Sequence, residues 1–298
     1  MTDQPRLIVV GGPTASGKTS LAIELARHFG TEILSGDSRQ FYREMRIGNA
    51  RPDAEELAAV RHHFVADRSL TTPLTAGRFA EEALGVLAGL WKNQSTAVLV
   101  GGSGLYLRAL CEGLDEFPPV TARAEQRVAT LLAEEGLVGL QREVERLDPA
   151  YYAEVDRQNG RRLERALKVC YSAAAPYSSF LGNRPTRSFR PVYLQPALER
   201  ATLYDRINRR VDLMDAAGLE AEARSLLSFR DQPILQTVGY QEWWPYFDGE
   251  YDRTRALELI KRNSRRYAKR QLTWFGRGGQ YRPVAGLKDA LDYLSSPA

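Results

Sequence analysis

The sequence predicts an α/β protein in which a parallel-sheet core is interrupted by an all-helical segment. Three short apolar runs, residues 7–10, 32–35 and 97–100, are each followed by glycine or polar residues and then by helical periodicity. After Pro118 the character changes, and residues 121–172 show helical patterns without a convincing strand. Strands that alternate with helices pair in parallel, because the helix returns the chain to the same end of the sheet. We therefore expect a sheet core carrying one helical insertion.

The composition is that of a soluble globular protein. The 298 residues are 43% hydrophobic and 26% charged, and the net charge is only +4. Cys111 and Cys170 lie far apart with no paired spacing, so we expect reduced thiols and a cytoplasmic location. No apolar run reaches 18 residues, and a polar start leads directly into the first strand. We expect neither a signal peptide nor a membrane span.

A phosphate-binding loop follows the first strand. The segment GPTASGKT matches the pattern G-x-x-x-x-G-K-[ST] and leads into a helix over residues 20–26. Its backbone N–H groups and the start of the helix can surround an anion. Lys18 can then reach the outer phosphates, and the Thr19 hydroxyl can bind Mg²⁺. The alternative is a glycine-rich turn, and the pattern does not identify the phosphate compound. The phosphate-binding residues expected here are Gly12, Pro13, Thr14, Ala15, Ser16, Gly17, Lys18 and Thr19.

Polar residues also follow the second and third strands, at the edge where ligands bind to open parallel sheets. Asp37 comes directly after residues 32–35 and is a candidate general base, Mg²⁺ ligand or helix N-cap. Ser103 follows two glycines after residues 97–100, and it either approaches a ligand or caps the next helix. His62 and His63 are adjacent, so they cannot readily share one metal ion, and we expect structural roles for both.

The rest of the chain is expected to be mainly helical. Within the insertion we expect helices over residues 124–135, 137–147 and 161–171. A polar linker over 178–190 leads to a strand at 192–194, and helices follow from about 199 to the end. The predicted core therefore comprises residues 1–117 and 190–298, and the insertion comprises 118–189.

One helix near the end of the chain carries a one-sided row of cations. Between Lys261 and Gln271, six basic residues fill one half of the helical wheel, without an acidic residue among them. Such a stripe suits a polyanion, because it supplies phosphate contacts without reading a base sequence. Further basic groups are Arg161, Arg162, Arg165, Arg206, Arg209 and Arg210.

Together these motifs resemble the tRNA dimethylallyltransferase (isopentenyltransferase) family over nearly the whole chain. The blocks that carry the resemblance occur in the family's order: GPTASGKT, DSRQFYREMRIGNARP, HHFVAD, VGGSGLYLRAL, DPAYYAEVDRQNGRRLERAL, RINRRVDLMDAAGLEAEARSLL, TVGYQEWW and RRYAKRQLTWF. Three departures are visible: Ser103 stands where the family more often has threonine, Arg51 stands where it has lysine, and residues 76–79 follow the family only loosely.

The resemblance implies a P-loop NTPase-like parallel sheet flanked by helices, with an all-helical insertion that clasps the tRNA anticodon arm. The implied reaction moves a dimethylallyl group from its diphosphate to N6 of the adenosine 3′-adjacent to the anticodon, in tRNAs that read codons starting with U. It implies Mg²⁺ as cofactor, diphosphate as product and a monomeric enzyme. Although the loop reads as an ATP-binding motif, no ATP is required.

The resemblance also assigns roles to residues. Asp37 would act as the general base, and the Ser103 hydroxyl would lie near the reacting centre. Together with the cationic helix, it places the following residues against tRNA: Asp37, Ser38, Arg39, Gln40, Arg127, Arg161, Arg162, Leu163, Glu164, Arg165, Gln236, Thr237, Val238, Gly239, Tyr240, Gln241, Lys269 and Arg270.

Three other functions compete with this one. A small-molecule kinase would use the loop to bind ATP and would transfer its terminal phosphate. An enzyme that prenylates free adenine nucleotides would have little use for the basic helix. A nucleotide-controlled RNA-binding switch would not need Asp37 as a base.

Overall fold

The structure is a computed structural model that describes residues 4–296, and the chain divides into two compact units. The sheet unit is Met1–Cys111 with Arg187–Ala298, and the helical unit is Glu112–Thr186. These bounds differ by a few residues from the predicted 118–189. Residues 112–117 belong to the helical unit, where the Phe117 ring stacks on Tyr177 with centroids 4.7 Å apart.

The sheet unit is built on a parallel sheet, as predicted. Within the described residues the strand order is β3-β2-β4-β1-β5-β6, and every pairing is parallel. The central strands β1 and β4 are buried almost throughout, which explains their continuous apolar sequences. The strands are β1 Arg6–Gly11, β2 Ile33–Ser35, β3 His62–His63, β4 Thr96–Gly101, β5 Arg190–Pro196 and β6 Arg282–Val284.

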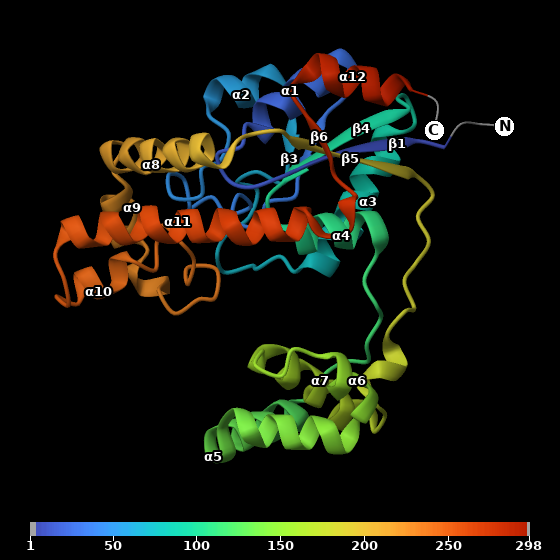
Figure 1. Ribbon diagram of the computed structural model, residues 1–298, viewed down its shortest axis with the longest axis vertical. Coiled ribbons are helices and arrows are strands. Elements are labelled where there is room, and N and C mark those ends of the chain that lie inside the picture. The colour runs from blue at the N-terminus through green and yellow to red at the C-terminus, as the bar shows by residue number, and fades with distance from the viewer. Residues whose placement is uncertain (1–3, 297–298) are drawn as a thin grey trace. The chain divides into compact units, whose positions relative to one another are not determined.

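Helices cover both faces of this sheet (Figure 1). On one face, α1 (Lys18–His28) and α12 (Leu287–Ser295) share an apolar core with β1, β4 and β5. On the other lie α3 (Ala76–Leu90) and α4 (Gly104–Glu112). The short helix α2 (Ala54–Ala59) lies between β2 and β3 in sequence. This layering leaves the carboxyl ends of the strands free to build a site.

A second group of helices lies beyond that end of the sheet. Helices α8 (Arg200–Ala216) and α11 (Arg253–Phe275) pack side by side through Leu203, Ile207 and Ala268 (Figure 1). Between them in sequence come α9 (Leu219–Ser225) and α10 (Trp243–Phe247). The packed pair also contacts Ala15 of the phosphate loop, so helices far along the chain reach the site.

The helical unit has its own apolar core, formed among α5 (Ala122–Leu147), α6 (Pro149–Glu154) and α7 (Gly160–Ala173). Helix α5 is interrupted at Gly136, whose φ of 62° only glycine adopts readily. The prediction of two helices meeting at residue 136 is therefore confirmed. Asp148 caps α6 and also accepts hydrogen bonds from Ser178, which ties the end of the unit to its core.

Two strands were not predicted from the sequence. His62 and His63 form the edge strand β3, where His63 Nε2 lies 2.6 Å from Glu32 Oε2. The expectation of helices from residue 199 to the end was wrong at β6, because a three-residue edge strand containing Pro283 has no alternating pattern. Across residues 4–296, no helix combines the length and apolar character that crossing a membrane requires.

The close approach of β2 and β4 generates the first prediction. An added Cβ at Gly101 would lie 2.5 Å from the carbonyl oxygen of Gly36, and backbone cannot move aside easily. Gly101→Ala should therefore lower the free energy of unfolding by about 1–3 kcal/mol. Gly85→Ala is the matched control, because nothing lies within 4 Å of an added Cβ there. It should stabilise α3 by about 0.5–1 kcal/mol. Urea denaturation of both variants tests this, and an unchanged Gly101→Ala midpoint would contradict it.

Candidate active site

The phosphate loop curls between β1 and α1. Its turn depends on left-handed backbone at Ala15 (φ 63°) and Gly17 (φ 88°), which directs the chain into the helix. Residues 14–20 line a cavity of about 690 Å³, whereas Gly12 and Pro13 are not among the lining residues. The Ser16 hydroxyl is buried without a hydrogen-bond partner in the described structure. A buried donor without a partner beside a cradle of backbone N–H groups is suited to an anionic ligand.

Three segments distant in sequence complete the cavity. Asp37 and Arg39 enter from the loop after β2, and Arg210 enters from α8. Arg210 Nη1 lies 3.3 Å from Thr14 Oγ1, which fixes the arginine beside the phosphate loop. Among the described residues, the lining has more cations than carboxylates: Lys18, Arg39, Arg46, Arg51 and Arg210 against Asp37, Asp53 and Glu56. This excess of positive charge favours a phosphorylated ligand.

Burial lowers the pKa of two of these cations. It lowers the pKa of Lys18 to about 8, with Asp37 opposing the shift and Arg210 and Arg39 adding to it. Burial also lowers the pKa of Arg210. The Lys18 ammonium is 3.3 Å from the Pro13 carbonyl oxygen, so a backbone dipole and the Asp37 carboxylate share its charge. A bound anion would supply the missing counter-charge and raise the pKa of Lys18 again.

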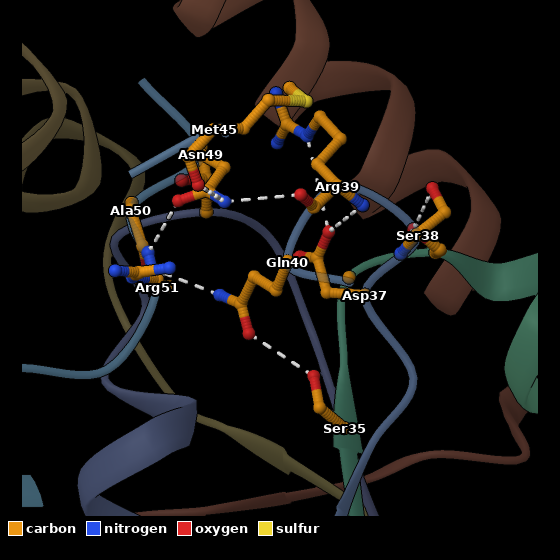
Figure 2. A network of polar contacts seen from close by, with 12 residues as sticks. Ser35, Asp37, Ser38, Arg39, Gln40, Met45, Asn49, Ala50 and Arg51 are labelled. Carbon is orange, nitrogen blue, oxygen red and sulfur yellow. Dashed lines mark hydrogen bonds and ion pairs between the residues drawn. The ribbon is translucent and has the colours of Figure 1, made fainter. Parts of the chain in front are cut away.

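Asp37 is buried and its carboxylate is held within its own loop (Figure 2). Its Oδ1 accepts the Arg39 backbone N–H at 3.2 Å and lies 3.9 Å from Arg39 Nε. The Arg39 guanidinium is 4.6 Å from the centre of the Tyr267 ring on α11. Asp37 is thus oriented through Arg39, and Arg39 is in turn fixed by an aromatic face.

Neighbouring hydroxyl and amide groups fix the same loop. The Ser103 hydroxyl accepts the Ser38 backbone N–H at 3.0 Å and lies 3.0 Å from the Ser38 hydroxyl. Gln40 accepts from the Ser35 hydroxyl at 3.1 Å and donates to the Ala50 carbonyl at 3.1 Å, as Figure 2 shows. Asp37 and Ser103 are therefore brought to one edge, as expected for the ends of neighbouring parallel strands, and Gln40 is occupied within the protein.

A carboxylate that sequence reasoning missed supports the next turn of the chain. Glu222 on α9 accepts the backbone N–H groups of Arg46, Ile47 and Gly48 at 2.7–3.0 Å. It also accepts the Tyr240 hydroxyl at 2.7 Å. Tyr240 is fully buried, and burial raises its pKa. Glu222 thus anchors the loop that leads away from Asp37.

The residues expected against tRNA in the sheet unit divide into two groups. Gln236, Lys269 and Arg270 are exposed, and Thr237 and Gln241 are half-buried. Val238 and Tyr240 are buried, which leaves their side chains no surface for an RNA contact. The basic helix is less open than its sequence suggests. Lys261 pairs with Asp212 of α8 at 2.5 Å, and Arg265 donates to Asn208 at 2.6 Å.

The helical unit shows the same division. Arg161, Arg162 and Arg165 are exposed on α7, and the Arg165 guanidinium is 5.3 Å from the centre of the Phe117 ring. Leu163 is fully buried in the core of the unit, so its side chain faces away from solvent. Glu164 pairs with Lys168 at 3.9 Å. Arg127 stacks on the Tyr171 ring at 3.9 Å and pairs with Glu143 at 3.6 Å.

Comparison with known proteins shows the family to which this chain belongs. The model of the family described as IPP transferase matches residues 40–278. The chain belongs to the IPP transferase family. A relative named tRNA dimethylallyltransferase, from Christiangramia forsetii, is 45% identical over 97% of both chains.

Two solved structures share the fold. The tRNA isopentenylpyrophosphate transferase of Bacillus halodurans is 33% identical, with a TM-score of 0.69 over 94% of this chain and 90% of that one. A eukaryotic dimethylallyltransferase described as acting on tRNA is 22% identical. It has a TM-score of 0.81 over 98% of this chain and 76% of its own. At that identity the second likeness concerns the fold alone.

Arg210 is a cavity residue that could have been found from the sequence. Arg210 lies in the RINRRVDLM block, yet the sequence analysis treated it only as one of several basic residues. The structure places it in the cavity next to Thr14. Its spacing on the helix was a usable signal, since Arg210 lies at the edge of the face that carries the buried Leu203, Ile207 and Val211.

The lowered pKa of Lys18 predicts pH-dependent anion binding. Lys18 is charged below pH 8 and loses its charge as the pH rises through that value, so its contribution to affinity should decline above pH 8. Near pH 7, Lys18→Met should weaken binding of inorganic pyrophosphate by about tenfold or more. By pH 9.5 the ratio of the two dissociation constants should approach one. Calorimetric titration of both proteins at each pH measures the two dissociation constants, and their ratio cancels the ionisation of pyrophosphate itself. A ratio that does not change with pH would contradict the prediction.

Proposed function

We propose that this chain transfers a dimethylallyl group from dimethylallyl diphosphate to N6 of the adenosine 3′-adjacent to the anticodon. The substrates are tRNAs that read codons starting with U, and the products are N6-isopentenyladenosine and diphosphate. The observation that carries the proposal is one cavity lined by both the phosphate loop and the buried carboxylate of Asp37. The names of the relatives support the same chemistry.

The phosphate end of the cavity suits the leaving group. Breaking an allylic C–O bond places positive charge on the prenyl carbon and negative charge on the departing diphosphate. Loop N–H groups, Lys18, Arg210 and the Ser16 hydroxyl stand ready to stabilise that charge. Removing one such fixed donor costs about 2.7–4 kcal/mol of barrier.

We propose that Mg²⁺ binds with the diphosphate at Thr19. Thr19 lines the cavity beside Lys18, and its hydroxyl is a hard oxygen donor of the type that Mg²⁺ prefers. Across the described residues, no three His, Cys, Asp or Glu side chains form a metal cluster. When bound, the ion would neutralise part of the charge that develops on the diphosphate.

The carboxylate end suits the attacking amine. The exocyclic amine of adenine is a poor nucleophile and must lose a proton as its bond to carbon forms. Asp37 is placed to take that proton. Arg39 and the Ser103–Ser38 hydrogen bonds hold the Asp37 loop in position, which explains why a serine hydroxyl can serve where the family more often has threonine.

The basic side chains suit RNA. To reach Asp37 the adenosine must leave its stack, which costs a few kcal/mol that contacts elsewhere on the RNA must offset. We propose that the exposed Lys269 and Arg270 of α11 bind tRNA phosphates. We propose that Arg127 and the exposed arginines of α7 clasp the anticodon arm as part of the insertion.

The proposal extends to the working form of the enzyme. We propose a monomer in the cytoplasm, where the buried thiols of Cys111 and Cys170 stay reduced. The reaction requires no ATP. A kinase would instead consume ATP, an enzyme for free nucleotides would prenylate AMP as well as RNA, and a binding switch would leave RNA unmodified.

Replacing the proposed base separates chemistry from binding. Asp37→Asn retains the shape and the hydrogen bond to Arg39 but cannot take a proton. Single-turnover transfer to an anticodon stem-loop should fall by about 10²–10⁴-fold, with RNA affinity nearly unchanged. Mass spectrometry for a C₅H₈ addition gives the readout. The exposed Glu24→Gln serves as control, and a parent-like rate for Asp37→Asn would remove Asp37 from this role.

Salt dependence tests the cationic helix. Lys269→Ala and Arg270→Ala should each weaken tRNA binding and reduce the slope of log affinity against log salt by about one unit. Lys288→Ala removes an exposed lysine from α12, on the sheet face, and should leave the slope unchanged. Filter binding across a range of salt concentrations measures all three. If all three variants have the same slope as the parent protein, Lys269 and Arg270 have a role outside RNA contact.

A further inference from the structure

The buried side chain of Gln271 on α11 joins the two loops that form the catalytic edge. Its amide oxygen accepts the backbone N–H of Thr14 at 2.9 Å. Its amide nitrogen donates to the carbonyl oxygen of Gly102 at 2.9 Å. Thr14 belongs to the phosphate loop, and Gly102 follows β4 directly before Ser103. One planar group thus spans from the proposed diphosphate cradle to the loop beside Asp37.

Gln271 and Asp37 both lie close to Gly102. An added Cβ at this glycine would lie 2.5 Å from Gln271 Nε2 and 3.3 Å from Asp37 Oδ2. The amide and the carboxylate therefore approach the same point from two sides, and only a residue without a side chain leaves room for both. Thr14 is fixed from the other side as well, because Arg210 lies 3.3 Å from its hydroxyl.

We propose that Gln271 is a positioning residue that sets the distance between the bound diphosphate and Asp37. The inference rests on the proposed function, because it concerns the same transfer. Atoms that react must approach to about 3–3.5 Å, and a misplacement of about 1 Å can cost about 100-fold in rate. A group that holds both loops therefore affects the chemical step more than the binding of either substrate.

The first test removes both hydrogen bonds. Gln271→Met has similar length but can neither accept from Thr14 nor donate to Gly102. With the donor and an anticodon stem-loop both saturating, single-turnover transfer should fall about 10–100-fold. The donor KM and the RNA dissociation constant should each change by less than about three-fold.

Gln94 provides a matched control. Its amide accepts from the Thr31 hydroxyl at 2.7 Å and donates to the Gly30 carbonyl at 2.7 Å, in the turn before β2. Gln94→Met removes a similar bridge away from the cavity, so it should lower the melting temperature without lowering the transfer rate. An equal loss of rate in both variants would mean that Gln271 acts only through stability and would overturn the inference.

A charge variant and a double-mutant cycle keep the test decisive if Gln271→Met folds poorly. Gln271→Glu retains an acceptor for Thr14 but adds a negative charge near Asp37, so the acid limb of the pH–rate profile should move up by about one unit. In a cycle of Gln271→Ala and Gly102→Ala, the double variant should lose no more rate than the worse single variant. An unmoved pH profile or fully additive losses would each overturn the inference. Failure of the parent enzyme to transfer at all would instead contradict the proposed function.

Discussion

The structure depends on buried positive charge at the carboxyl end of a parallel sheet. Lys18 is held in the protein interior with Arg39 and Arg210 near it, and burial lowers the pKa of both Lys18 and Arg210. Bringing cations together away from water is costly unless an opposite charge joins them. Asp37 supplies only part of that charge, and an anion in the cradle would supply the rest. The loop after β1, the loop after β2 and helix α8 each contribute charged side chains to this cluster.

The side chains that fix the geometry of the site come from a helix late in the chain. Tyr267 fixes Arg39, Gln271 fixes Thr14 and Gly102, and both side chains lie on one helix. Between these two residues, the same turn of α11 exposes Lys269 and Arg270 to solvent. A single rigid element therefore links the outer basic surface to the inner catalytic edge. This arrangement explains why a helix rich in cations also contains buried, uncharged polar residues.

The parts of the site that follow from local rules could be predicted. The loop 12–19 has its own sequence pattern, and Ser103 contacts the loop that carries Asp37 because neighbouring parallel strands end at the same edge. The packing of side chains between distant segments could not be predicted in this way. Leu163, Val238 and Tyr240 were expected at an RNA surface but are buried. Glu222 and Gln271 act through contacts more than 150 residues away, for which no local pattern exists.

Proton binding and anion binding at Lys18 are linked in this cavity. An entering diphosphate stabilises the charged form of Lys18, so donor binding and protonation of this lysine promote each other. In the proposed transfer the leaving group would gain negative charge while Asp37 would gain a proton, so the cations and the base would act at opposite ends of the reacting atoms. Their separation must therefore be fixed before the reaction begins. A rigid bridge between the two loops meets that condition at no cost in reorganisation.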